Sequence, residues 1–247
     1  MTNYKVTMSF RGTNYHGFQK QADNLRLRTI QGTVEQGFCK LLGEKVSIDG
    51  CSRTDAGVHA NEYAFSCALE NSIDERGIIF GLNGVLPKDI AIRGCEKVPD
   101  DFHARYSCKG KEYKYIIHNS EIRSAFHEDL WFRSWYPIDA EKLDKASKDF
   151  IGTHDFKSFC STDTDKKETV RTIYDFSVGR EGDLVIFKVS GDGFLYNMVR
   201  IMVGTLLFIN DDKLPRDSIP KIIAACDRTR AGKTVPPHGL YLNKVFY

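Results

Sequence analysis

The chain has 247 residues and a mass of 28.1 kDa, which suits one large domain or two small ones. Hydrophobic residues make up 41%, charged residues 28% and aromatic residues 12%, values that exclude collagen, coiled coils and intrinsic disorder. The formal net charge of +2 neither requires nor excludes a nucleic-acid partner. The longest apolar stretch, residues 198–209, contains Arg200 and is too short for a bilayer, so we expect a soluble, intracellular protein.

Alternating strands and helices are predicted for the first half. Apolar and polar residues alternate over residues 4–11, which predicts a half-buried strand with no signal peptide before it. Thr29 can cap a helix that Gly43 ends. The pattern further predicts strands over 46–51 and 63–69, a helix over 74–84 and a strand around 90–92. The resulting order is β-α-β-β-α-β.

A repeat of this order is predicted for the second half. The pattern predicts strands over 113–117, 170–178, 184–189 and 240–247, and helices over 140–151, 194–209 and 219–225. We therefore expect an α+β fold of two ferredoxin-like subdomains with antiparallel sheets, residues 1–105 and 106–247.

Seven cysteines occur without a C-x-x-C pair. Structural zinc sites use closely spaced ligands, and disulfide frameworks use even numbers in short secreted chains. We expect reduced, mostly buried thiols and no metal site.

The most unusual local sequence is DGCSRTDAGVHA at residues 49–60, which joins two predicted strands. Catalytic groups often lie on loops held between rigid strands. Asp55 could equally cap local backbone amides and pair with Arg53, and residue types alone do not separate the two interpretations. Ser52, Asp55 and His59 are the residue types of a hydrolytic triad, although triad members normally come from separate elements. A metal shared by Asp55 and His59 would lack an evident third ligand, and a structural histidine is favoured.

This loop closely resembles, over residues 50–60, the signature loop of the tRNA pseudouridine synthase A (TruA) family. Further segments resemble the family in the same order along nearly the whole chain: 10–19, 29–32, 99–107, 111–117, 193–200 and 239–242. One departure is Ser52, where the family most often has glycine.

The resemblance implies two subdomains flanking a basic active-site cleft, in a cytoplasmic homodimer that uses no cofactor. It implies conversion of uridine to pseudouridine at positions 38, 39 and 40 of the tRNA anticodon stem-loop. Asp55 is matched to the nucleophile, Arg200 to its ion-pair partner, Arg53 to the arginine that extrudes the base, and Tyr113 to the aromatic that stacks on the flipped uracil.

Physical arguments support these roles. Burial raises the pKa of a carboxylate, so an ionised Asp55 requires a nearby cation, and Arg200 interrupts an otherwise apolar segment. A stacked uridine must be flipped at a cost of a few kcal/mol, and stacking on an aromatic ring returns about 1–3 kcal/mol. A core role for Tyr113 stays open because Tyr115 shares its face.

The basic segments 1–28 and 105–114 are expected to contact phosphates. Three alternatives also stay open: a non-catalytic RNA-binding protein on the same scaffold, a paralogue that modifies other uridines, and a hydrolase that acts through Ser52. Whether the carboxylate attacks C1′ or C6 is open as well.

Overall fold

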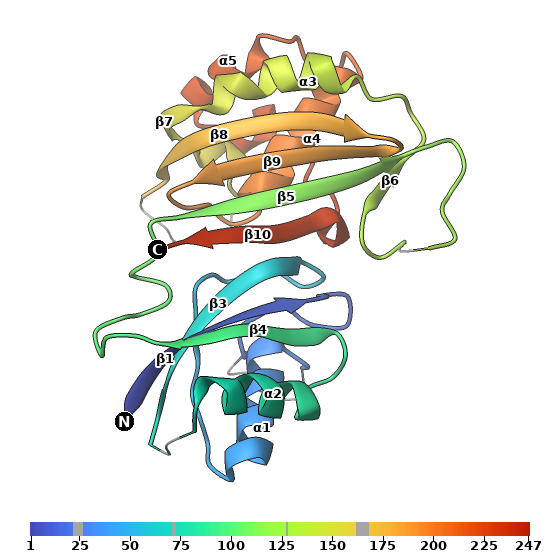
Figure 1. Cartoon of the computed structure of the whole chain (residues 1–247). Helices are drawn as coiled ribbons and strands as arrows, with labels where there is room; N and C mark the ends of the chain where they lie inside the picture. Colours follow the sequence, from blue (N-terminus) through green and yellow to red (C-terminus); the bar gives the residue numbers. More distant parts are fainter. Residues whose placement is uncertain (22–26, 71–72, 127, 162–167) are drawn as a thin grey trace. The chain divides into compact units, whose positions relative to one another are not determined.

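The computed structural model describes residues 1–21, 27–70, 73–126, 128–161 and 168–247. The chain forms two compact units, Met1–Lys109 together with Tyr241–Tyr247, and Gly110–Leu240 (Figure 1). This division differs from the predicted one at the C-terminus, where the last strand lies with the first unit. The reason is a long-range pairing, because β10 (Leu240–Phe246) runs parallel to β3 (His59–Leu69).

A mostly antiparallel sheet carries the first unit. Strand β1 (Thr2–Phe10) lies between β3 and β4 (Ile90–Lys97) and is antiparallel to both. Strand β2 (Asp49–Gly50) pairs antiparallel with β3. Helices α1 (Ile30–Leu42) and α2 (Glu75–Val85) pack against each other, and Phe38 of α1 meets Phe65 of β3 edge-on, with ring centroids 6.3 Å apart. The core of this unit therefore lies between its helices and the sheet.

The ends of α1 follow the predicted capping residues. The Thr29 side chain accepts a hydrogen bond from the Gly32 amide at 3.2 Å, and Gly43 ends the helix in the left-handed region with φ of 76°. The Asp74 side chain accepts from the Gly77 amide at 2.7 Å and so starts α2. Caps of this kind contribute about 1 kcal/mol each.

The strand predicted over 46–51 is largely wrong. Only Asp49 and Gly50 join the ladder. Val46 and Ile48 are buried all the same. Alternating burial without strand pairing explains the strand-like sequence pattern.

Strands pair within the second unit as well. Strand β9 (Leu184–Gly191) lies between β5 (Gly110–Asn119) and β8 (Val170–Glu181) and is antiparallel to both. Strand β7 (Gly152–Asp155) pairs antiparallel with β8, and β6 (Phe132–Ser134) pairs parallel with β5. The helices are α3 (Ala140–Ser147), α4 (Met198–Asn210) and α5 (Ser218–Ala225). Nine of the thirteen residues of α4 are buried, so this helix forms the centre of the unit.

Three differences from the predicted elements occur here. Strands β6 and β7 were not predicted, because three and four residues are too few for a recognisable alternation. The predicted helix over 194–209 begins only at Met198, because Asn197 has a φ of 60° and cannot continue a right-handed helix. The helix predicted over 140–151 ends at Ser147 and continues as a 3₁₀ turn, Lys148–Phe150.

Together the two units form a mixed α+β fold with mostly antiparallel strands. All seven cysteines are thiols outside any disulfide; Cys51, Cys67 and Cys160 are buried, Cys39 is exposed, and the others are half-buried. Within the described ranges, no helix has the length and apolar character needed to cross a membrane.

Candidate active site

The loop between β2 and β3 holds two of the predicted site residues. Its buried residues Cys51, Thr54 and Val58 anchor it, whereas Asp55 is half-buried and Arg53 is exposed. The Val58 amide donates to the Asp55 carbonyl at 3.2 Å, which closes a tight turn. The loop is thus fixed through its backbone and presents a carboxylate and a guanidinium.

The segment after β1 packs directly against this loop. The Phe18 amide donates to the Thr54 carbonyl at 3.1 Å. A Cβ on Gly12 would lie 2.0 Å from the Val58 carbonyl oxygen. Gly17 has a φ of 84°, and a Cβ there would lie 2.5 Å from the Thr54 carbonyl oxygen. Only glycine allows the two segments to approach this closely.

An aromatic pair supports the start of the loop. The rings of Phe18 and Tyr63 are stacked with centroids 4.5 Å apart. The Tyr63 hydroxyl donates to the Ser52 carbonyl and accepts from the Ser52 amide. A Cβ on Gly50 would lie 2.2 Å from that hydroxyl oxygen, so Gly50 is also required by close packing.

His59 takes a structural position. It is fully buried, its Nδ1 accepts from the Gly12 amide at 3.0 Å, and its ring lies 4.8 Å from that of Tyr241. Because Nδ1 is an acceptor, it binds no proton or metal in this arrangement. This favours the structural interpretation of His59 over a metal ligand or a triad base.

A hollow of about 190 Å³ lies beside Arg53. Its lining is Phe18, Gln19, Gln31, Ile48, Asp49, Gly50, Ser52, Arg53, His103, Arg105 and Tyr106. Tyr106 is 77% exposed, and the Arg105 guanidinium lies 5.8 Å from the centre of its ring. Two arginines and an exposed aromatic ring are a combination that favours phosphates and unpaired bases.

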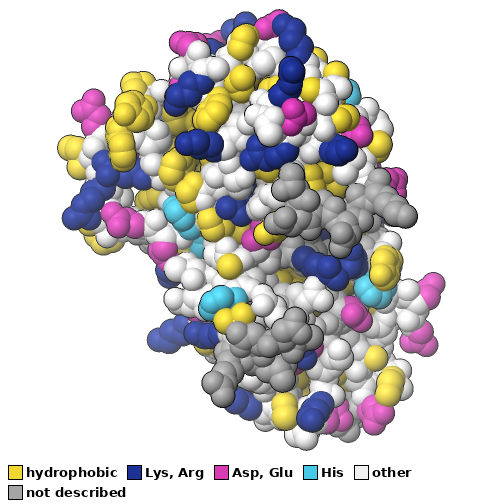
Figure 2. All heavy atoms as spheres, turned by 180° about the vertical axis from the view of Figure 1, so that it is seen from behind, with side chains coloured by type: hydrophobic (Ala, Val, Ile, Leu, Met, Phe, Trp, Pro, Cys, Tyr) yellow, Lys and Arg dark blue, Asp and Glu magenta, His cyan; other side chains and the backbone are white. Residues whose placement is uncertain are grey.

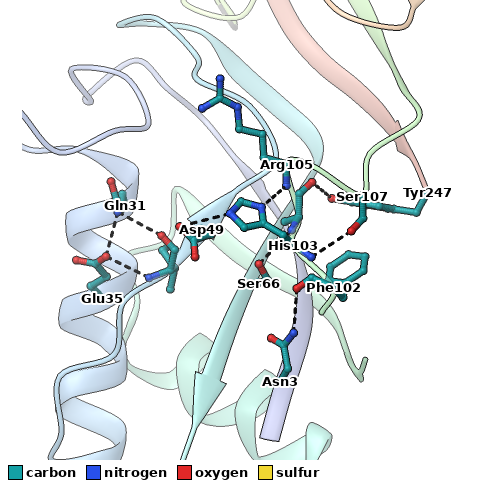
Figure 3. A network of polar contacts seen from close by, with 12 residues as sticks. Asn3, Gln31, Glu35, Asp49, Ser66, Phe102, His103, Arg105, Ser107 and Tyr247 are labelled. Atoms are coloured by element: carbon teal, nitrogen blue, oxygen red, sulfur yellow. Dashed lines mark hydrogen bonds and ion pairs between the residues drawn. The ribbon is translucent and has the colours of Figure 1, made fainter. Parts of the chain in front are cut away.

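The turn that carries Arg105 is fixed by a polar network (Figure 3). His103 Nδ1 accepts from the Arg105 amide at 3.1 Å, and the Ala104 amide donates to Ser66 Oγ at 3.1 Å. The Tyr247 hydroxyl donates to the Ala104 carbonyl at 2.7 Å, and His103 Nε2 lies 4.0 Å from Asp49 Oδ1. The guanidinium of Arg105 points away from this network in Figure 3. The network therefore fixes the backbone of this turn, while the Arg105 guanidinium lies outside the network.

Several basic side chains of the predicted phosphate-binding segment 1–28 are paired with carboxylates. Lys5 lies 2.5 Å from Glu96, Lys20 forms an ion pair with Glu35, and Arg28 lies 3.9 Å from Asp89. Arg26 lies outside the described residues. In Figure 2, basic side chains on one face form several separate groups among apolar ones. The positive charge available to phosphates is therefore smaller than the residue count predicts.

Arg200 lies in the first turn of α4, in the second unit. Its Nε donates to the Val235 carbonyl at 2.7 Å, and its Nη1 donates to Asn197 Oδ1 at 2.6 Å. Both acceptors are neutral, so they orient the guanidinium without cancelling its charge. Burial raises the pKa of the nearby Tyr115, and the charge of Arg200 acts in the opposite direction.

Tyr113 lies on β5 and is 7% exposed. Its ring meets that of Phe194 edge-on, with centroids 5.1 Å apart. Phe194 and Asn197 belong to one short segment before α4, which contacts Tyr113 through the first residue and Arg200 through the second. Sequence reasoning missed Asn197 and Val235, because no local motif marks an oxygen that orients a distant arginine.

The predicted site residues are thus divided between the units, with Asp55 and Arg53 in the first and Arg200 and Tyr113 in the second.

The segment AGKT at residues 231–234 has a sequence similar to the end of a phosphate-binding loop, but it packs against α4 instead. The Gly232 amide donates to Thr205 Oγ1 at 2.8 Å, and a Cβ on Gly204 would lie 1.7 Å from the Lys233 carbonyl oxygen. Among the described residues, no group of three or more His, Cys, Asp or Glu side chains is arranged to hold a metal ion.

Comparison with known proteins places the chain in one family. The family described as tRNA pseudouridine synthase matches residues 6–107 and 146–247. A tRNA pseudouridine synthase A of Acetivibrio thermocellus is 44% identical over the full length of both chains. That of Ruminiclostridium cellulolyticum is 42% identical over the full length of both, and tRNA pseudouridine synthase A 1 of Bacillus cereus is 43% identical over all of this chain and 99% of its own. The chain therefore belongs to the tRNA pseudouridine synthase family.

Proposed function

We propose that this chain converts uridine to pseudouridine at positions 38, 39 and 40 of the tRNA anticodon stem-loop, with Asp55 as the nucleophile. Membership of the family makes the chain an isomerase that forms pseudouridine in tRNA. The observation that carries the assignment of Asp55 is its position on a turn fixed by backbone hydrogen bonds and close glycine packing. A rigid loop places a reacting group accurately, which is what catalysis requires.

The reaction rearranges one nucleotide and exchanges no electrons with a cofactor. The C1′–N1 bond breaks and a C1′–C5 bond forms, C5 loses a proton, and N1 gains one. A carboxylate can form an ester at C1′, stabilise positive charge on the sugar, or attack C6 of the base. Each of these roles requires an ionised Asp55, because a neutral carboxyl group is a poor nucleophile.

Arg200 is proposed as the cation that keeps Asp55 ionised. A guanidinium near a carboxylate lowers the pKa of that carboxylate. Its Nε and Nη1 contacts to the neutral oxygens of Val235 and Asn197 support this role, because they orient the group and leave its charge uncompensated by those oxygens.

Arg53 and Tyr113 are proposed to handle the extruded uridine. Arg53 is exposed on the same loop as Asp55 and lines the hollow that also contains Arg105 and Tyr106. Tyr113 would stack on the flipped uracil, with its ring oriented by the contact to Phe194. The C5 proton also needs a base, and we assign that role to the Tyr113 phenol.

The finer fold belongs to the same proposal, namely two ferredoxin-like subdomains and a basic active-site cleft. The order β4-β1-β3-β2 in the first unit supports the ferredoxin-like assignment. The second unit repeats part of this arrangement. There β9 lies between β5 and β8 and is antiparallel to both, as β3 lies between β1 and β2 in the first unit. A homodimer that binds tRNA in the cytoplasm completes the proposal, and its support is the family resemblance.

The test is pseudouridine mapping in tRNA from cells that lack this protein. We expect loss of pseudouridine at positions 38, 39 and 40, with restoration by the parent chain but not by Asp55→Asn. Asp101→Asn is the matched control for expression, because Asp101 is an exposed carboxylate of the same unit. This variant should restore pseudouridine as the parent chain does. Loss at other uridines would instead identify a paralogue with a different target. Restoration by Asp55→Asn would reject the nucleophile.

A further inference from the structure

The carbonyl that orients Arg200 belongs to a segment that a buried tyrosine holds in turn. Arg200 Nε donates to the Val235 carbonyl at 2.7 Å, and the Val235 amide donates to the Arg200 carbonyl at 3.3 Å. The next carbonyl along the chain, that of Pro236, accepts from the Tyr115 hydroxyl at 2.8 Å. Two neighbouring carbonyls thus connect strand β5 to the guanidinium on helix α4.

The stretch of chain between these two carbonyls is stiff. Pro236 has a φ of −56°, an angle that the proline ring itself fixes. A residue that precedes a proline is restricted to extended conformations, which applies to Val235 before Pro236 and to Pro236 before Pro237. A shift of the Pro236 carbonyl is therefore passed on to the Val235 carbonyl.

Tyr115 has the surroundings needed to fix this segment. It lies on β5 and is fully buried. A Cβ on Gly239 would lie 2.7 Å from the Tyr115 Cζ atom, so the chain that follows the two prolines packs closely against the ring. Burial raises the pKa of the phenol, so the hydroxyl keeps its proton and stays a donor near neutral pH. A close-packed ring of this kind has one position, and its hydroxyl therefore fixes the Pro236 carbonyl.

A buried tyrosine in the first unit makes the same kind of bond at a different place. Tyr4 is 2% exposed, and its hydroxyl donates to the Ile73 carbonyl at 3.0 Å. Ile73 belongs neither to the Asp55 loop nor to the segments that hold Arg200. The bond of Tyr4 is thus a measure of what a buried hydroxyl contributes to stability alone.

We propose that Tyr115 is a positioning residue: its hydroxyl fixes the segment that orients the guanidinium of Arg200. The bond holds the Pro236 carbonyl, and the stiff link to Val235 holds the acceptor of Arg200 Nε. Tyr115 acts on the reaction only through Arg200. The consequence for catalysis rests on the proposed function, in which Arg200 keeps Asp55 ionised.

The direct test is the exchange of the Arg200 Nε–H proton with solvent, measured in ¹H–¹⁵N NMR spectra of the whole chain. Its signal is identified by its absence from the spectrum of Arg200→Lys. Tyr115→Phe keeps the ring and removes only the hydroxyl, so a proton now held less firmly on its carbonyl should exchange about tenfold faster. Tyr4→Phe, in the other unit, should leave the rate within about twofold. An unchanged rate in Tyr115→Phe would overturn the proposal.

Kinetics separates positioning from stability. Loss of one buried hydrogen bond should lower Tm by about 2–4 °C in both Tyr115→Phe and Tyr4→Phe. Tyr115→Phe should also lower kcat by about tenfold and leave the KM for tRNA within about twofold, because a misdirected guanidinium impairs the reaction step and not binding. Tyr4→Phe should leave both parameters within about twofold. Equal kcat in the two variants, or a rise in KM without a fall in kcat, would contradict a positioning role.

A parallel measurement on Asp55→Asn distinguishes failure of this inference from failure of the proposed function. If Asp55→Asn is inactive while Tyr115→Phe keeps the parental kcat, the inference fails and the proposed function stands. If Asp55→Asn is active, the proposed function fails, and the exchange rate of the Arg200 Nε–H proton still decides whether Tyr115 orients Arg200.

Discussion

The two groups of candidate catalytic residues are held in different ways. In the first unit, the Asp55 loop is fixed by backbone hydrogen bonds and by glycines that allow two chain segments to touch. In the second, Arg200 is oriented by its side-chain contacts to Asn197 and Val235. The first arrangement should therefore fail when a Cβ is added, and the second should weaken step by step as polar groups are removed.

Among the variants that change how the two groups are held, Gly12→Ala should have the largest effect. The added Cβ would lie 2.0 Å from the Val58 carbonyl oxygen, so the Asp55 loop must shift. Overpacking of this kind costs about 1–3 kcal/mol of stability, and a displacement of the loop should lower activity by about 100-fold. Thermal unfolding and tritium release from C5-labelled uridine in tRNA measure the two effects. The matched control is Gly84→Ala in α2, where no atom lies within 4 Å, and it should be neutral or stabilising. Equal behaviour of the two variants would refute the close-packing account.

Tyr113 separates stacking from proton transfer. Tyr113→Ala should lose most activity, because stacking on a base is worth about 1–3 kcal/mol. Tyr113→Phe keeps the ring and should still bind RNA and break the glycosidic bond, but should release pseudouridine slowly if the phenol removes the C5 proton. Single-turnover rates decide between the roles, with exposed Tyr174→Phe as the control. Full speed for the phenylalanine variant removes the proton-transfer role, and full speed for the alanine variant removes Tyr113 from the site.

Asn197→Gly should weaken the second group without disrupting the fold. Glycine tolerates the φ of 60° at this position, while the hydrogen bond to Arg200 Nη1 at 2.6 Å is lost. A hydrogen bond to a charged group is worth about 1.5–3 kcal/mol, so kcat should fall by about tenfold or more with little change in Tm. Asn197 Nδ2 also donates to Ser161 Oγ at 2.8 Å. Ser161→Ala removes that contact, keeps the Asn197 side chain that accepts from Arg200, and should retain kcat. A matching loss in Ser161→Ala would assign the effect to Ser161 instead.

Arg105→Gln should have the smallest effect and should act on binding. Its guanidinium points away from the network that fixes its backbone, so its loss should leave the turn intact (Figure 3). If it neutralises one phosphate, the slope of log K against log salt should decrease in magnitude by about 1. Lys20→Gln is the comparison, because Lys20 is paired with Glu35 and should change the slope less. Equal slopes in the parent and Arg105→Gln would exclude a phosphate contact at this residue.

Local signals predicted much of the fold. Thr29 and Gly43 mark the two ends of α1, because caps and left-handed glycines are determined by a few neighbouring residues. The short strands β6 and β7 and the pairing of β10 with β3 depend on contacts far along the chain. The late start of α4 follows from the left-handed conformation of one non-glycine residue, Asn197, which the sequence pattern does not reveal.

The candidate site, like the fold, was predicted where its residues are neighbours in the sequence and missed where they are distant. The Asp55 loop is contiguous in sequence, so the sequence alone identifies its residues as candidates. The pairing of Lys20 with Glu35 and of Arg28 with Asp89 joins residues from different elements and changes the expected charge of segment 1–28.

The most direct test of the central claim is the activity of Asp55→Asn. The substitution is nearly isosteric and leaves the backbone contacts of the loop possible, while an amide neither attacks carbon nor carries negative charge. Purified Asp55→Asn and Asp101→Asn proteins should bind tRNA within a few-fold of the parent. In the tritium-release assay, the account predicts parental activity for Asp101→Asn and less than about one per cent of it for Asp55→Asn. Substantially higher activity for Asp55→Asn would contradict the role of Asp55 as nucleophile.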